Sequence, residues 1–326
     1  MYTIRPYFPT TEEDYTPLVA VHNAAWPDDL TTIASWLFRD KSWPADKLRT
    51  RFVVESGGQM VSSGAYMETH WAKAPDKYVY FYSSVPAVEE DASLHQLVYD
   101  FVLDALSDRK PKVLSTDARE DKTFRVRWLE SQGFVPGMRF VVSELDIRNF
   151  DFSRFNGAQE KVANAGIHFV SLADLQQRDS NWMMKLYDML WEIEQDVPQP
   201  DPPVQEPFDE FVKWFDSPNL WPEGWVLAID PTLDGDDPVG AYVGVSMLAK
   251  NLPMPQRIQT WLTGVVRSHR RKGIALAMKL RAIEFAIANG GTSIRTDNEE
   301  NNPMLGINKA LGFVEIPAEV AFDKQL

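Results

Sequence analysis

The sequence predicts an α+β protein built from two similar domains in tandem, and three observations lead to this prediction. The chain has 326 residues, which is more than one compact domain usually contains. Two short motifs recur, because residues 115–117 and 132–135 match residues 295–297 and 311–314 at offsets of 180 and 179 residues. Strand-like and helix-like segments also follow one another in the same order around both copies. Together these observations indicate a duplicated unit.

Each copy is predicted to run strand, helix, strand, helix and closing strand. In the second copy the first four segments are 258–266, 273–289, 293–298 and 303–311. The helix at 273–289 should end at Gly290-Gly291. The residues of this helix that we expect to face the sheet are Leu276, Leu280, Ile283 and Ile287.

In the first copy the corresponding segments are 78–85, 93–106, 112–116 and 122–131. The residues of its first helix that we expect to be buried are Leu94, Val98, Phe101 and Ala105.

Upstream of each copy the pattern indicates an opening strand, two helical stretches and a hairpin. In the first half the opening strand is 2–5, and the hairpin joins 51–55 to 60–69 across Gly57-Gly58. In the second half the segments are the strand 167–171, the helices 181–195 and 208–215, and a hairpin from 225–230 to 239–248 across Asp234-Gly235-Asp236. The segment 149–166 has few periodic apolar residues. We therefore expect a first domain at 1–150, a linker at 151–164 and a second domain at 165–326.

Composition excludes several classes of protein. The formal net charge of -14 argues against a nucleic-acid partner and is better suited to a small cationic substrate. The chain has no cysteine, and its histidines are scattered singly, so we predict no metal site. No apolar run reaches the roughly 18 residues of a membrane span, and the first residues do not resemble a secretory signal. We expect a cytoplasmic protein without a membrane partner, and a homodimer is left open.

The segment 267–272 carries most of the predicted chemistry. Five of its six residues can be positively charged, and an amphipathic helix follows at Gly273. A helix amino terminus is already electropositive, so this arrangement favours a bound anion such as a pyrophosphate. Gly273 would let the backbone approach the phosphates. The sequence contains neither the P-loop nor the dinucleotide-binding pattern.

These residues resemble the GNAT superfamily of N-acetyltransferases. The resemblance rests on Thr263-Gly264-Val265-Val266, on Arg270-x-x-Gly273-x-Ala275, and on Asn298, Asn301, Met304, Asn308 and Leu311-Gly312-Phe313. It implies an α/β three-layer fold in which helices flank a mixed, mostly antiparallel sheet. It also implies that acetyl-CoA binds with its pantetheine arm along Gly264, Val265 and Val266. The pyrophosphate would lie at Arg270, Arg271, Lys272, Gly273, Ile274 and Ala275, and Asn301 and Asn308 would lie beside the thioester.

The first copy lacks this phosphate-binding pattern. At the corresponding place, residues 87–93 contain three acids, no base and no glycine. This segment should repel a pyrophosphate, and Asp91 or Ser93 is predicted to cap the following helix. We therefore expect the first domain to be a scaffold beside the active cleft.

Catalytic residues are not assigned from the sequence. Where some GNAT members carry a glutamate base this chain has Gln259, and where many carry a tyrosine acid it has Asn308. Glu192, Glu194 and Asp196 are alternative bases, although a solvated helix face is the commoner use of such residues. Five tryptophans could line a pocket for a cationic amine or simply pack in the core: Trp182, Trp191, Trp214, Trp221 and Trp225.

The sequence leaves the role of the proline-rich segment 197–207 open between two alternatives. This segment cannot form a helix or a central strand, so it is either a stiff surface connection or a lid that lines the substrate site.

The expected function is transfer of an acetyl group from acetyl-CoA to the primary amine of a small molecule by direct attack. Tandem architecture at this length resembles mycothiol synthase-like proteins, which would imply a cysteinyl amine as acceptor. A non-catalytic protein that binds or senses acyl-CoA is the alternative from another class.

Overall fold

The computed structural model describes residues 1–233 and 239–326. The first half contains β1 (Tyr2–Tyr7), α1 (Glu12–Ala25), α2 (Ile33–Lys41), β2 (Arg49–Ser56), β3 (Gln59–Glu68), β4 (Lys77–Ser84), α3 (Ala92–Leu106), β5 (Val113–Arg119), α4 (Thr123–Ser131) and β6 (Val135–Asp146). The second half contains α5 (Ala158–Asn164), β7 (His168–Ser171), α6 (Leu172–Arg178), α7 (Trp182–Glu194), α8 (Phe208–Val212), β8 (Trp225–Asp230), β9 (Ala241–Ala249), β10 (Arg257–Val265), α9 (Ile274–Ala288), β11 (Ser293–Glu299), α10 (Pro303–Leu311) and β12 (Val314–Gln325). The predicted strands and helices are present, with ends that differ by a few residues.

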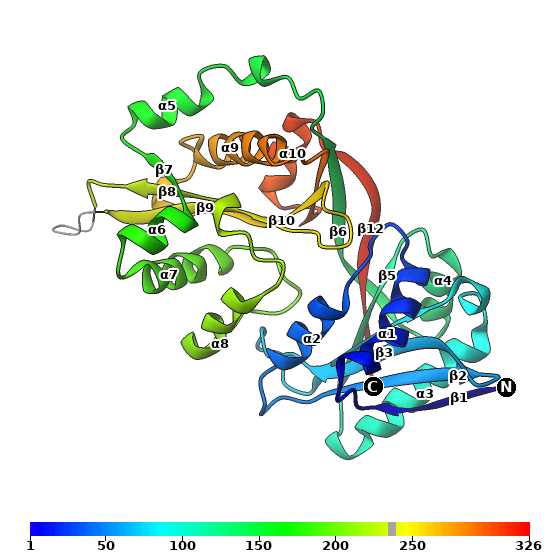
Figure 1. Cartoon of the computed structure of the whole chain (residues 1–326). Helices are drawn as coiled ribbons and strands as arrows, with labels where there is room; N and C mark the ends of the chain where they lie inside the picture. The colour runs from blue at the N-terminus through cyan, green and yellow to red at the C-terminus, as the bar shows by residue number, and fades with distance from the viewer. Residues whose placement is uncertain (234–238) are drawn as a thin grey trace.

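The strands form one continuous twelve-stranded sheet in the order β1-β2-β3-β4-β5-β12-β6-β11-β10-β9-β8-β7 (Figure 1). The pairs β4–β5 and β10–β11 are parallel, and the other neighbouring pairs are antiparallel. Each parallel pair is joined by one long helix, α3 in the first half and α9 in the second. The predicted mixed, mostly antiparallel sheet is confirmed.

The two halves exchange their last strands. β6 comes from the first half of the chain but pairs with β11, while β12 comes from the second half and pairs with β5. β6 and β12 also pair with each other and join the two halves at the centre of the sheet. A cut of the chain at residue 150 would therefore separate strands that depend on each other for their hydrogen bonds.

The segment predicted as a linker, 151–164, is structured. It contains a short 3₁₀ turn (Phe152–Phe155) and α5, and its aromatic side chains pack against an apolar cluster to which α9 contributes. In Figure 1, α5 and α9 lie on one side of the strands β8–β10, and α6 and α7 lie on the other. Among the described residues, no helix is both long and apolar enough to cross a membrane.

Two of the predicted buried positions are wrong. In α9, Leu280 and Ile283 are buried as expected, but Ile287 is 40% exposed because it lies in the last turn, next to the helix end. In α3, Ala105 is exposed while Leu106 is fully buried. The buried residues of α3 include Leu94, Val98, Val102 and Leu106, which are spaced four residues apart. Because an α-helix has about 3.6 residues per turn, this line of buried residues rotates gradually around the helix. The turn predicted at Asp234-Gly235-Asp236 lies outside the described residues.

Candidate functional site

A gap opens between the parallel strands β10 and β11. They pair only from Arg257–Ser293 to Gln259–Arg295, although β10 continues to Val265 and β11 to Glu299. A register shift between Thr260 and Thr263 also displaces β10 relative to β9. Beyond the shift, Gly264 and Val265 pair with β9 on one side, so their other backbone edge faces the gap. The gap thus offers unused backbone groups of β10 to an extended ligand.

Gly264 also has a packing role that the sequence did not reveal. A Cβ atom at this position would collide with the side chain of Ile193, which belongs to α7. Glycine is therefore required here for α7 to pack against β10, whether or not a ligand is bound.

The amino terminus of α9 lies directly after β10 and has the geometry of an anion site. Gly273 is the N-cap residue with φ of +86°, and Arg271 has φ of +64°, so the chain makes a tight turn into the helix. No side chain caps this helix, and the first backbone N–H groups of a helix have no acceptor within it. Arg271 and Lys272 are exposed beside these groups. Positive charge and free N–H groups are therefore concentrated at one point.

Not all of the basic segment is available to a ligand. Arg267 forms two bonds of 2.7 Å with Asp196, and its backbone N–H donates to Glu192. Arg270 donates to the carbonyl oxygen of Val265 and pairs with Asp196 at 2.7 Å. Hydrogen bonds from these arginines lower the pKa of Asp196 to about 2. These contacts hold the end of α7 against β10, and they leave Arg271 and Lys272 without an ion pair among the described residues.

The two asparagines expected near the thioester are placed differently from each other. Asn301 lies before α10 and donates its backbone N–H and side-chain amide to Glu299, whereas the cap of α10 is Asn302. Asn308 is fully buried in α10 and donates to Asn298 of β11 at 2.6 Å. Both residues stabilise the loop that follows β11, at the open end of the gap.

Two cavities meet at the gap. The large one has a volume of about 1620 Å³ and is bounded by both halves of the molecule, including β4, β5 and α2 of the first half and α7, α8 and β10 of the second. The small one, of about 120 Å³, is bounded by β10, β11 and α9. Their shared wall residues are Phe140, Val197, Trp261, Leu262, Thr296 and Asp297.

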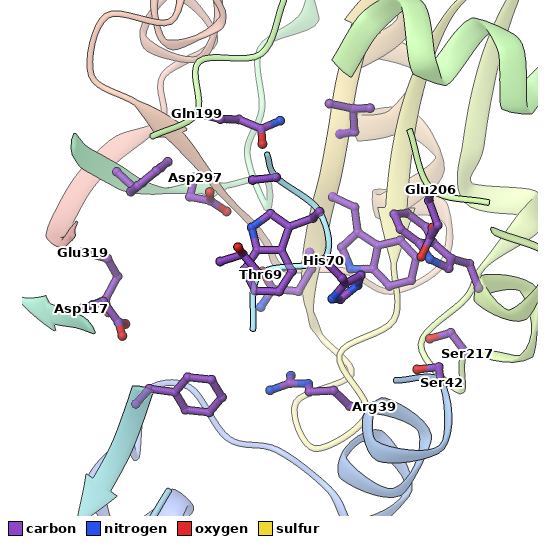
Figure 2. Close-up of a pocket in the computed structure, with 18 of the residues that line it drawn as sticks. Arg39, Ser42, Thr69, His70, Asp117, Gln199, Glu206, Ser217, Asp297 and Glu319 are labelled. Atoms are coloured by element: carbon purple, nitrogen blue, oxygen red, sulfur yellow. The ribbon is translucent and has the colours of Figure 1, made fainter. Parts of the chain in front are cut away.

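Three carboxylates lie on the sheet side of the large cavity: Asp117 of β5, Asp297 of β11 and Glu319 of β12 (Figure 2). Burial raises the pKa of all three carboxyl groups, and the charge of Asp117 contributes to raising that of Glu319 to about 7. Asp117 and Asp297 are exposed to the open space of the cavity, whereas Glu319 is half-buried. This part of the cavity is suited to a cationic or proton-releasing group.

Positive side chains also reach this cavity, and Arg119 and Arg295 among them lie close to acids. Arg119 pairs with Asp28 and Asp121, and Arg295 lies 3.5 Å from Glu144.

The proline-rich segment 197–207 forms another wall of the cavity, where burial and nearby acids raise the pKa of Glu206 to about 7. The segment therefore lines the cavity, as its lid alternative predicts.

The remaining candidates from the sequence divide between the cavity and the core. Gln259, Glu194, Trp191 and Trp214 line the large cavity. Trp182 packs on Phe215, Trp221 packs on Phe285, and Trp225 is fully buried. Glu192 and Asp196 bind the basic segment and are not on the cavity wall. No group of three or more potential metal ligands occurs in the described part of the chain.

The corresponding helix of the first half is capped from within. Asp91 is the N-cap of α3, and its carboxylate accepts hydrogen bonds from the backbone and side chain of Ser93 and from Tyr2. The predicted capping role of Asp91 is therefore confirmed. A carboxylate thus lies at the amino terminus of α3, where α9 has no side-chain cap, and the adjacent Glu89 and Glu90 add negative charge.

Sequence reasoning missed Glu319 and Lys279, a buried residue of α9 that lines the small cavity. It also missed the cavity role of Asp117 and Asp297, although the signal was present. These two residues occupy the same position in the two copies of the repeated motif, Asp117 on β5 and Asp297 on β11.

No protein-family model and no curated protein matches this sequence. Solved structures do match over the whole chain. A tandem GNAT protein from the clavulanic acid biosynthesis pathway has a TM-score of 0.75 and 15% identity, with coverage of 100% of this chain and 98% of that one. A GCN5-related N-acetyltransferase from Sphaerobacter thermophilus has a TM-score of 0.69 and 14% identity, with coverage of 99% and 95%.

A glucosamine N-acetyltransferase region of a fungal multi-domain β-N-acetylglucosaminidase has a TM-score of 0.67 and 11% identity, with coverage of 99% of this chain and 38% of that one. At these identities the likeness concerns the fold. From end to end, this chain has the fold of the tandem GNAT acetyltransferases.

Proposed function

We propose that this protein transfers an acetyl group from acetyl-CoA to the primary amine of a small, cationic molecule. The observation that carries the proposal is the gap between β10 and β11, which begins near the amino terminus of α9 and opens into the large cavity. A pyrophosphate at α9 and an extended arm along β10 would bring an acyl group to that cavity. The acceptor would enter between the two halves.

The residues present fit the acyl donor. Arg271, Lys272 and the first N–H groups of α9 would hold the pyrophosphate, and the free backbone edge of Gly264 and Val265 would pair with the pantetheine amides. Arg270 would act indirectly by fixing the turn through Val265 and Asp196. The bound donor supplies an activated acyl group, and the protein supplies its orientation.

Glu319 is the residue that we propose as the proton acceptor for the attacking amine. A general base works best when its pKa lies near the operating pH, and the pKa of Glu319 is raised to about 7. Because the base must be ionised, we expect the rate to rise with pH through about 7 and then level. Asp117 and Asp297 would bind the positive charge of the acceptor.

The decisive experiment measures release of free CoA thiol from acetyl-CoA in the presence of a panel of small amines, including polyamines, amino sugars and a cysteinyl amine. We expect thiol release with at least one cationic amine. Glu319→Gln should lower kcat/KM by about 100-fold and remove the rise near pH 7, with little change in acetyl-CoA affinity. An unchanged pH profile in this variant would assign the base elsewhere.

A second function, non-catalytic binding of acyl-CoA, is favoured by Gln259 and Asn308, which cannot serve as base and acid. Tight binding of acetyl-CoA without thiol release from any amine would support it. Absence of binding would reject both functions.

A further inference from the structure

Helix α9 buries one charged residue. Its buried side chains are Ile274, Ala277, Met278, Lys279, Leu280, Ala282, Ile283 and Ala286. Lys279 is only 4% exposed and is the one member of this set that is not apolar. A leucine or methionine would complete the apolar face, so the presence of lysine requires a separate explanation.

The amine of Lys279 has no hydrogen bond or ion pair with any described residue. It lies over the ring of Phe313, whose centre is 5.6 Å away, in a cation–π contact. Burial lowers the pKa of this amine to about 8. A buried amine without a hydrogen bond or ion pair destabilises the folded protein, because one cation–π contact offsets only part of the desolvation of the ammonium. The fold alone gains little from this residue.

Lys279 lies on the wall of the small cavity at the gap between β10 and β11. The titratable groups on this wall are Lys279 of α9 and Asp297 and Glu299 of β11. The residues that β10 and the proline-rich segment contribute to this wall have no titratable side chain. They are Trp261, Leu262 and Thr263 of β10, and Val197 and Pro198. The carboxylate of Glu299 is already bonded to Asn301. The amine therefore faces a space in which an acceptor from outside the protein could be placed.

We propose that Lys279 binds the acyl donor by donating a hydrogen bond from Nζ to a carbonyl oxygen of its pantetheine or thioester arm. The inference rests on the proposed function, which brings this arm into the gap. A carbonyl there would give the buried amine the partner that the protein lacks. Lys279 would fix the arm between α9 and β11, beyond the reach of the exposed cations at the start of the helix.

The test compares Lys279→Met with wild type, using Lys309→Met as the matched control. Lys309 is an exposed lysine of α10 that pairs with Glu315 at the surface. Calorimetry would measure binding of acetyl-CoA and of adenosine 3′,5′-bisphosphate, which lacks the pantetheine arm. We expect Lys279→Met to weaken acetyl-CoA binding about tenfold or more and leave bisphosphate binding unchanged. Lys309→Met should change neither.

Two further readouts separate binding from a structural role. Without ligand, Lys279→Met should have a higher Tm than wild type, and the difference should shrink as pH rises from about 8 to about 10.5. A lysine whose pKa is lowered in the folded protein destabilises the folded state while the amine is protonated. This penalty vanishes once the amine is neutral in both the folded and the unfolded state. Binding of acetyl-CoA by wild type near pH 8 to 9 should take up a proton that the variant does not take up.

The outcomes distinguish failure of the proposed function from failure of the donor-binding role of Lys279. If wild type binds neither probe, the proposed function fails. If wild type binds acetyl-CoA and Lys279→Met binds it equally well, the donor-binding role of Lys279 is overturned while the proposed function stands. A lower Tm with parallel losses for both probes would assign Lys279 to folding and also overturn the inference.

Discussion

At the scale of single residues, the start of α9 depends on one backbone conformation. Gly273 has φ of +86°, a region that side chains with a Cβ rarely adopt, and it lies where the first N–H groups of the helix are free. Gly290, at the other end of the same helix, has φ of +80° with open space around it. The two glycines share a conformational requirement, but only Gly273 lies at the candidate anion site.

The same substitution at these two glycines should therefore have different effects on acetyl-CoA binding. Gly273→Glu should abolish acetyl-CoA binding, because it places a carboxylate where the pyrophosphate would lie. Gly290→Glu should leave binding within about twofold, while both variants lose roughly 1–2 kcal/mol of stability from strain. Calorimetry and thermal unfolding would measure the two effects. Equal loss of binding in both variants would mean that α9 folding, and not its amino terminus, controls the ligand.

At the scale of elements, the proline-rich segment connects the second half to the first. The backbone of Val204 donates to Trp71 at 3.0 Å, and that of Lys73 donates to Pro202 at 2.8 Å. The side chain of Lys77, which is 9% exposed, binds Asp201 at 2.8 Å and also Asp323. Prolines restrict the segment to an extended form, and these contacts hold it over the cavity.

We therefore predict that Asp201→Asn loosens the segment without affecting the acyl-donor site. Lys77 would keep Asp323 but lose its bond to the loop, so KM for the acceptor should rise roughly fivefold while acetyl-CoA affinity stays unchanged. Faster hydrogen exchange in residues 197–207 would report the loosening directly. Asp76→Asn, which removes an exposed pair with Lys112, is the control and should have no such effect. No change in exchange in Asp201→Asn would refute the role of this contact.

At the scale of the whole molecule, the exchange of β6 and β12 makes the two halves one folding unit. β12 pairs with β5 over residues 319–325, and β6 pairs with β11 over residues 140–146. Neither half can complete its sheet from its own residues, and an unpaired central strand edge is strongly unfavourable.

Accordingly, the full chain should unfold in one cooperative transition, and the fragments 1–150 and 151–326 should not fold when expressed separately. Co-expression of both fragments should restore a folded complex, because the missing strands are then supplied. Calorimetry of the full chain and circular dichroism of the fragments would test this. A folded 1–150 fragment, or two separate transitions in the full chain, would contradict it.

The sequence by itself determined the features that depend on residues close together in the chain. The order of strands and helices, the duplication, the basic turn before α9 and the acidic cap of α3 were all predicted, because each follows from local spacing, charge and backbone preference. The burial prediction was wrong at Ile287, which lies in the last turn of α9, and at Ala105, because the line of buried residues rotates around α3.

Only the tertiary structure decided which distant residues meet. Glu319 lies beside Asp117 because β12 crosses into the first half, and no local pattern encodes that exchange. Nothing near Lys279 in the sequence indicates that it is buried, and its place on the cavity wall depends on the separation of β10 and β11 next to α9. The physical reason is the same in both cases: burial and electrostatics depend on three-dimensional neighbours, whereas local propensity depends on neighbours along the chain.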